Sequence, residues 1–253
     1  MSNRTWLHDM NPSLKFIIVL FSMLTLAWFF NPWTPLLFFL GIILLQLLFS
    51  RVKWKVWFLF MVPIVFTAIG YLWTTLLFAA DTSCTVIWTW GSFKVTDTQW
   101  NTALSLAFRV FAFSSMSLLF ALTTDPVKFV MSLMQQLRLS PKLAYGVMVG
   151  YQFLPVVKDE FIHIRHAHRL RGIGEEKNVW QRLLGMRRML IPLLAGAVRR
   201  AERSAFAMEA RGFTGERRSS YYEPIFINGR DWFLATIMIV LLIGSSVAGY
   251  LLR

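Results

Sequence analysis

The chain has 253 residues, of which 56% are hydrophobic, and it carries a formal net charge of +13. Its mean hydropathy of +0.53 is well above that of ordinary soluble domains, so the composition indicates a membrane protein. The single cysteine, Cys84, excludes an internal disulfide and any cysteine-rich metal site.

Five apolar stretches are long enough to cross a bilayer: residues 14–30, 35–49, 56–80, 101–122 and 231–251. A spanning helix needs about 20 apolar residues, which cover about 30 Å. Continuous apolarity without alternation favours helices over a β-barrel. We therefore expect an all-α membrane protein with about five transmembrane helices. Four lie in residues 1–124 and one in residues 231–253, separated by cytoplasmic or interfacial helices in residues 125–230.

Two basic residues lie within the expected spans. Lys15 is close enough to the cytoplasmic end of the first span to extend its ammonium to the membrane surface. Arg109 lies inside the fourth span, where a charge is costly and often functional. It is only about two turns from Trp100, so its side chain can instead reach outward along the helix. Strand-forming residues flank Gly91 between the third and fourth spans, which predicts a short external hairpin.

Basic residues are distributed unevenly between the loops. Arg51, Lys53 and Lys55 lie between the second and third spans, and residues 125–229 hold 17 Lys and Arg against nine Asp and Glu. The positive-inside rule therefore places the N-terminus, the 51–55 loop and residues 125–229 in the cytoplasm, and the C-terminus outside. The long basic segment carries no nucleic-acid recognition motif, so we expect protein partners and the bilayer, and no nucleic acid.

The basic segment begins with a helix-start signal. Asp125 can cap the helix N-terminus through its carboxylate, and Pro126 suits the first helical position. Apolar residues along one side predict a helix that lies on the membrane surface and ends before Ser140. After it we expect a long helix over 141–171, a short basic helix over 176–188 and a second long helix over 189–211.

The two long helices contain a near-repeat. Each has a proline, Pro155 or Pro192, and each ends in an arginine followed by a glycine, Arg171-Gly172 or Arg211-Gly212. An arginine in the last turn complements the helix dipole, and glycine commonly follows a helix. An arginine at a helix tip can also enter a partner's groove and donate several hydrogen bonds.

Arg171, rather than Arg169, corresponds to Arg211, because both directly precede a glycine. Arg169 lies about 200° around the helix from Arg171 and is expected on the helix flank. A stripe of small residues, each four apart, follows the second long helix: Ala197, Ala201 and Ala205. This stripe serves either ordinary packing or a crossing of the two long helices that brings both Arg-Gly ends together.

Glu160, His163 and His166 are the candidate metal ligands, since neighbouring pairs among them share a helix face. His168 points elsewhere, and no downstream cluster completes a site. The chain also lacks a phosphate-binding loop, a Gly-x-Ser-x-Gly motif and a His-Glu-x-x-His motif. We therefore expect no metal, no cofactor and no catalytic residue.

Two motifs resemble the transmembrane coupling (T) component of energy-coupling factor transporters. They are Leu122-Thr123-Thr124-x-Pro126-x-x-Phe129 and Arg199-Arg200-Ala201-Glu202-x6-Glu209-Ala210-Arg211-Gly212-Phe213. The likeness covers nearly the whole chain: four N-terminal spans, a cytoplasmic pair of Arg-Gly helices and a C-terminal span. At the first Arg-Gly end the chain departs from the family, with Leu170 where a small residue is usual.

The resemblance implies a non-catalytic scaffold and energy-coupling subunit of an ATP-driven vitamin or metal-ion uptake transporter. Such a subunit joins two cytoplasmic ABC-type ATPases to a small membrane protein that binds the substrate. The residues implied in ATPase docking are Arg171, Gly172, Ala210, Arg211 and Gly212. Those implied in supporting the coupling helices are Arg169, Pro155, Pro192, Ala201 and Glu209.

Two alternatives from other functional classes stay open at the level of sequence. A membrane-embedded metal-dependent enzyme would use Glu160, His163 and His166, and metal analysis with mutants of the histidines would identify it. A conventional ABC permease would bind substrate by itself, although few polar groups lie inside the expected spans.

Overall fold

The computed structural model describes residues 6–29, 31–50, 54–78, 86–90, 93–172, 179–217 and 220–252. These residues are mostly helical, which confirms the prediction of a helical membrane protein. Contacts divide the chain into two units. The apolar unit comprises residues 1–132 and 225–253, and the crossed-helix unit comprises residues 133–224.

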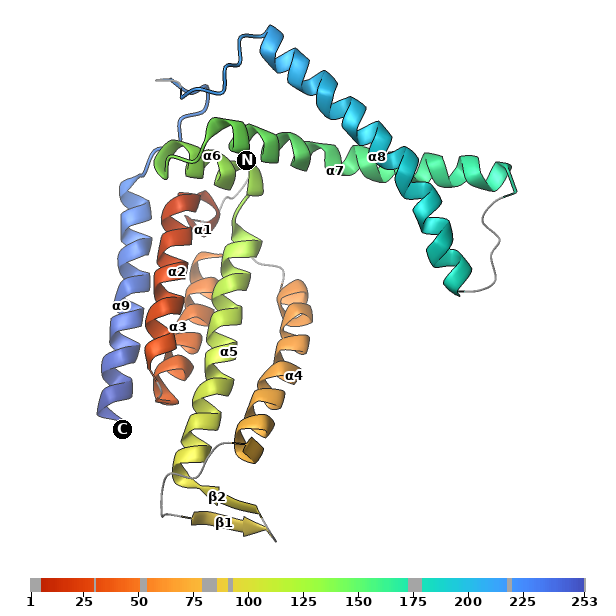
Figure 1. The fold of residues 1–253 in the computed structure, drawn as a ribbon. Helices are drawn as coiled ribbons and strands as arrows, with labels where there is room; N and C mark the ends of the chain where they lie inside the picture. The colour runs from red at the N-terminus through yellow and green to blue at the C-terminus, as the bar shows by residue number, and fades with distance from the viewer. Residues whose placement is uncertain are drawn as a thin grey trace. The chain divides into compact units, whose positions relative to one another are not determined.

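The apolar unit contains most of the helices (Figure 1). In chain order they are α1 (Trp6–Asp9), α2 (Pro12–Trp28), α3 (Trp33–Phe49), α4 (Trp54–Phe78), α5 (Asp97–Thr123), the first part of α6 (Pro126–Gln136) and α9 (Gly229–Leu251). By length and composition α4, α5 and α9 can each cross a membrane, whereas α2 and α3 are apolar but have only 17 residues each.

A short hairpin connects α4 to α5. Strand β1 (Val86–Trp90) pairs antiparallel with β2 (Phe93–Thr96), and Trp90 lies opposite Phe93 in the register. The predicted hairpin is therefore confirmed, while Gly91 itself lies outside the described residues.

Side-chain caps fix where several helices begin. The Asn11 side chain accepts hydrogen bonds from the backbone N–H groups of Ser13 (3.1 Å) and Leu14 (3.4 Å), just before Pro12 opens α2. The Asp125 carboxylate accepts from the N–H of Val127 at 2.8 Å, which confirms the predicted start of α6. These caps satisfy donors that a helix end would otherwise leave unpaired.

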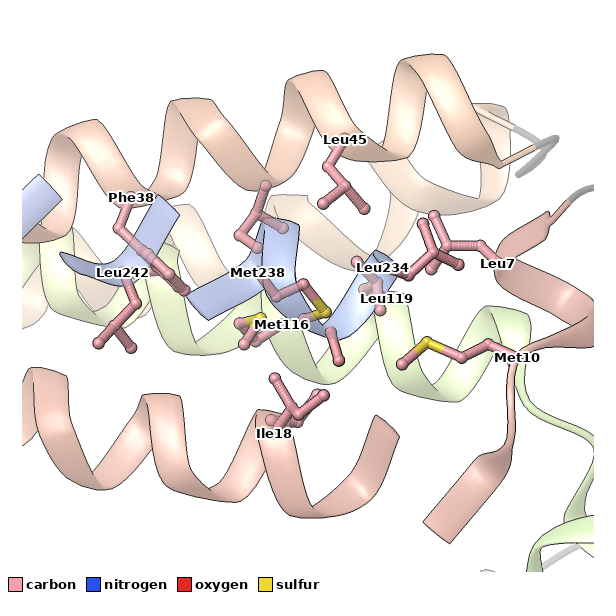
Figure 2. Packing of buried hydrophobic residues seen from close by; sticks show 14 of the residues in the cluster. Leu7, Met10, Ile18, Phe38, Leu45, Met116, Leu119, Leu234, Met238 and Leu242 are labelled. Atoms are coloured by element: carbon pink, nitrogen blue, oxygen red, sulfur yellow. The ribbon is translucent and has the colours of Figure 1, made fainter. Parts of the chain in front are cut away.

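The core of the apolar unit lies between α2, α3, α5 and α9 and is closed at one end by α1 (Figure 2). Its largest buried apolar side chains include Phe38, Met116, Leu119, Leu234 and Met238, each at most 2% exposed. The outer faces of α2, α3, α4 and α9 are also apolar: they expose Phe21, Leu24, Leu48, Phe66 and Val240. Large apolar surface outside a packed apolar core is typical of a protein that lipid surrounds.

The crossed-helix unit is built on two long helices, α7 (Pro141–Leu170) and α8 (Val179–Ala210), which contact each other. The chain after α8 folds back on the start of α7, where the Phe213 and Tyr145 rings meet edge to face with centroids 5.2 Å apart. In the same region, the Gln135 side chain donates to the carbonyl oxygen of Glu223 at 3.0 Å.

The prediction of separate helices over 176–188 and 189–211 is wrong, because α8 runs from Val179 to Ala210 without a break at residues 188–189 or at Pro192. An interior proline removes one backbone hydrogen bond and costs about 3 kcal/mol. The neighbouring residues are mostly Leu, Met, Arg and Ala, which have high helix propensity and allow the helix to continue.

Candidate functional site

The C-terminal ends of α7 and α8 have the same backbone geometry. Gly172 follows α7 with φ +72°, and its N–H donates to the carbonyl of Arg169 at 3.0 Å. Gly212 follows α8 with φ +78°, and its N–H donates to the carbonyl of Glu209 at 2.9 Å. Only glycine adopts this left-handed conformation without strain, so the glycine ends each helix directly after an arginine.

The end of α8 is closed by a second hydrogen bond, from the N–H of Phe213 to the carbonyl of Met208 at 3.0 Å, which completes a Schellman motif. Phe213 also packs on Tyr145, so the tip of α8 is held in place by its own unit. Arg211 therefore projects from a fixed helix end, and both Arg171 and Arg211 are exposed.

The other residues predicted to surround the two arginines are also accessible. Arg169, Glu209 and Ala210 are exposed, and Leu170 is 91% exposed. Their exposure leaves the last turn of each helix accessible within the described chain.

The two Arg-Gly ends do not lie together as the sequence suggested. Phe213 contacts Tyr145, and Tyr145 is 26 residues before Arg171, a distance of about 39 Å along a straight helix. The ends of α7 and α8 lie on opposite sides of the crossing between the two helices (Figure 1). The helices do cross, as one of the two alternatives required, but they cross in their middle, so their C-terminal halves diverge.

The crossing is made by an ion pair and a glycine. The guanidinium of Arg200 donates to the carboxylate of Glu160 at 2.8 Å, and its Cζ lies 5.9 Å from the centroid of the Phe153 ring. Gly196, one turn before Arg200, is buried, and a Cβ there would approach Glu160 Oε1 to 2.5 Å. The absence of a side chain at Gly196 thus makes room for the Glu160 carboxylate.

The predicted stripe of small residues does not form this crossing. Ala197 is half-buried, but Ala201 and Ala205 are exposed. Sequence analysis missed Gly196, although its spacing of four from Arg200 places both residues on one helix face. The stripe could not indicate which side of α8 would meet α7, because that depends on Glu160, 40 residues away from Arg200.

The candidate metal ligands do not converge. Glu160 is bound to Arg200, whereas His163 and His166 are both exposed. Among the described residues, no group of three His, Cys, Asp or Glu side chains could hold a metal ion. The geometry therefore gives the metal-dependent enzyme no support in the described part of the chain.

Lys15 is fully buried, so the prediction that it extends to the membrane surface is wrong. Its ammonium donates to the carbonyl of Leu7 at 2.6 Å and to the hydroxyl of Thr123 at 3.1 Å, with longer contacts of 3.4 Å to Thr123 O and Thr124 Oγ1. These oxygens replace water around the ammonium, which is why it does not need to reach the surface. The motif at 122–126 thus holds the end of α5 against α1 and α2.

Arg109 also has a structural partner within the apolar unit. Its guanidinium donates to the carbonyl oxygen of Phe29, the residue directly after α2. A cation at this position satisfies a carbonyl that the helix end leaves free and complements the helix dipole. The contact therefore supports a structural role for Arg109 at the end of α2.

An apolar face runs along α8 on the side away from α7. Ile191, Leu194 and Val198 are 71%, 61% and 57% exposed, and Ala201 and Ala205 extend the same face. Val198 lies two residues from both Gly196 and Arg200, about 200° around the helix from each. Helix α7 exposes a similar face near its start, formed by Leu143, Val147 and Leu154. Exposed apolar faces of this length mark contact surfaces for protein or lipid.

Comparison with known proteins identifies similar chains. The family model described as CbiQ, cobalt transport protein, matches residues 3–222. Over 243 residues the chain is 28% identical to the energy-coupling factor transporter transmembrane protein EcfT of Streptococcus thermophilus, covering 90% of this chain and 88% of that protein. It is 27% identical over 245 residues to the protein of the same name from Lacticaseibacillus paracasei, covering 94% and 92%. It is 29% identical over 246 residues to that of Streptococcus equi subsp. equi, covering 93% and 89%.

Proposed function

Because the chain belongs to the CbiQ family of cobalt transport proteins, we propose that it joins two ATPases to a substrate-binding membrane subunit in an energy-coupling factor transporter. As a member of this family it is a non-catalytic, multi-pass transmembrane component of a transporter. The proposal concerns its partners and the residues that contact them.

The equivalent ends of α7 and α8 carry this proposal. Each presents an exposed arginine at a helix tip, fixed by a glycine in the left-handed conformation. A guanidinium offers five N–H donors in a rigid plane, which suits a narrow groove lined by carboxylates or backbone carbonyls. Arg171 and Arg211 are therefore assigned to ATPase docking, and Gly172, Gly212 and Ala210 to shaping the tips.

The separation of the two ends favours two partner subunits over one. The contact of Phe213 with Tyr145 leaves most of the length of α7 between Arg211 and Arg171. Each arginine then occupies one ATPase, and closure of the ATPase pair on nucleotide binding moves both helices. The open and the closed ATPase pair make different contacts with the two helices, and this difference transmits energy to the membrane.

The exposed apolar faces of α7 and α8 fit the substrate-binding membrane subunit and the bilayer. Ile191, Leu194 and Val198 form the most exposed part of this surface. Movement of the two helices would reorient a subunit that rests on it. The cargo, a vitamin or a metal ion, is then recognised by that separate subunit.

The membrane topology follows from length and charge. The 17-residue helices α2 and α3 reach the lower limit for a span, which with α4, α5 and α9 gives five crossings. The basic residues place α6, α7 and α8 in the cytoplasm. Cys84, which lies outside the described residues, should then react with an impermeant thiol reagent added to intact cells; protection of Cys84 would oppose this topology.

Co-purification of the ATPases with arginine variants tests the proposal. Arg171→Ala and Arg211→Ala should each weaken ATPase attachment by about 2–5 kcal/mol, the usual cost of removing a charged partner from a desolvated contact. The double variant should retain no ATPase. Arg169→Ala and Arg203→Ala are matched controls, because both arginines are exposed near the same ends but do not precede a glycine. Full retention of both ATPases by the double variant would exclude this docking mode.

A further inference from the structure

An ion pair, an aromatic ring and a glycine meet where α7 and α8 cross. The ion pair between Glu160 and Arg200 joins the two helices there. Arg200 also lies over Phe153, and Gly196 provides the space for the Glu160 carboxylate. The charged pair is therefore accompanied by two further features, the Phe153 ring in α7 and the space at Gly196 in α8.

The ion pair is accessible to water. The side chains of Arg200 and Glu160 are 26% and 27% exposed. A partly exposed pair is screened by solvent, so it stabilises a geometry less strongly than a buried pair and can open and re-form. A contact with a defined geometry and a modest energy can set the angle between α7 and α8 and still allow that angle to change.

The crossing is also equally far from both arginines. Arg171 is eleven positions after Glu160 in α7, and Arg211 is eleven positions after Arg200 in α8. At 1.5 Å per residue, each helix extends about 16 Å from the ion pair to its terminal arginine. A change in the angle between α7 and α8 would therefore displace the two ends by similar amounts.

We infer that Glu160, Arg200 and Gly196 form a pivot that sets the separation of Arg171 and Arg211. The three are positioning residues, since they act on docking and transport through the two arginines. The inference rests on the proposed function for its consequence in transport, but the separation of the helix ends can be measured on the chain alone.

Distances between spin labels test the pivot directly. Leu170→Cys and Ala207→Cys place labels at exposed positions near the two ends, in a Cys84→Ser background of the full chain. Pulsed electron paramagnetic resonance in nanodiscs should give a narrow distance distribution for this parent. Glu160→Gln and Arg200→Ala should broaden it, because each removes one side of the ion pair.

Neighbouring residues supply the matched controls. Asp159→Asn and Arg199→Ala remove the same charges from adjacent exposed positions and should leave the distribution unchanged. The exchanged pair, Glu160→Arg with Arg200→Glu, should narrow the distribution again relative to either single exchange. Rescue by the exchange is a result that a general loss of helix stability does not produce.

The variant Gly196→Ala distinguishes disruption of the pivot from a loss of helix stability. Alanine has a higher helix propensity than glycine, so the substitution favours helical structure in α8. Its Cβ would nevertheless displace the Glu160 carboxylate. We expect a broadened distance distribution, retained ATPases and uptake reduced by about fivefold, near the lower end of coupling effects between sites.

The outcomes distinguish the pivot from the docking proposal. Unchanged distance distributions in Glu160→Gln, Arg200→Ala and Gly196→Ala would overturn the pivot, whatever the ATPases do. Failure of the parent chain to bind ATPases would overturn the docking proposal and leave the distance measurement valid.

Discussion

The two units use charged residues in opposite ways. In the apolar unit, the Lys15 ammonium is fully buried and donates to oxygens from the Leu7 carbonyl and the end of α5. In the crossed-helix unit, Glu160 and Arg200 meet at a partly exposed contact. A buried charge that loses its partners is very costly, whereas a partly exposed pair can separate at modest cost. The comparison indicates a rigid apolar scaffold and a pair of long helices whose angle can change.

Lys15→Met should produce the largest effect on stability, because it removes the buried hydrogen bonds that Lys15 makes in the apolar unit. Methionine retains much of the apolar stem but leaves the carbonyl of Leu7 and the hydroxyl of Thr123 without their donor. Each unsatisfied buried acceptor costs about 1–3 kcal/mol. Thermal unfolding of the detergent-solubilised chain should show a large decrease in midpoint.

Lys55→Met is the control for this change, since Lys55 is an exposed residue near the start of α4. Its unfolding midpoint should match that of the parent. Equal midpoints for Lys15→Met and Lys55→Met would show that the buried hydrogen bonds contribute little to the scaffold.

Gly172→Ala and Gly212→Ala should have a smaller effect, confined to the crossed-helix unit. Both glycines have positive φ, where a non-glycine residue costs about 1–2 kcal/mol. We expect about tenfold weaker binding of the corresponding ATPase, while the unfolding midpoint of the apolar unit stays near that of the parent. Titration of ATPase binding to the immobilised chain measures the first effect.

Gly146→Ala is the matched control in α7, because this glycine has no positive φ and a Cβ there would meet no atom within 4 Å. ATPase binding by this variant should equal that of the parent. If Gly146→Ala weakens ATPase binding as much as Gly172→Ala, the backbone conformation of the helix end does not determine ATPase binding.

Local features of the fold were predictable from the sequence because short-range physics determines them. The cap at Asp125, the hairpin beside Gly91 and the helix ends at Gly172 and Gly212 each depend on residues close together in the chain. The length of the apolar stretches likewise identified the long helices of the apolar unit.

Tertiary contacts account for what the sequence did not predict. The burial of Lys15 depends on Thr123, 108 residues away, which supplies an acceptor that no local pattern indicates. The role of Gly196 depends on the position of Glu160. The continuity of α8 through Pro192 shows that favourable neighbours can offset a helix breaker.

The most direct test of the account is to count the ATPases that the two helix ends touch. Leu170 and Ala207 lie close to Arg171 and Arg211 in the two helices, and both are exposed, so a photoreactive phenylalanine can replace either one. In the assembled transporter, each single replacement should cross-link one ATPase, and the double replacement should yield a product that contains two. A double replacement that never links more than one ATPase would contradict the assignment of one helix end to each subunit.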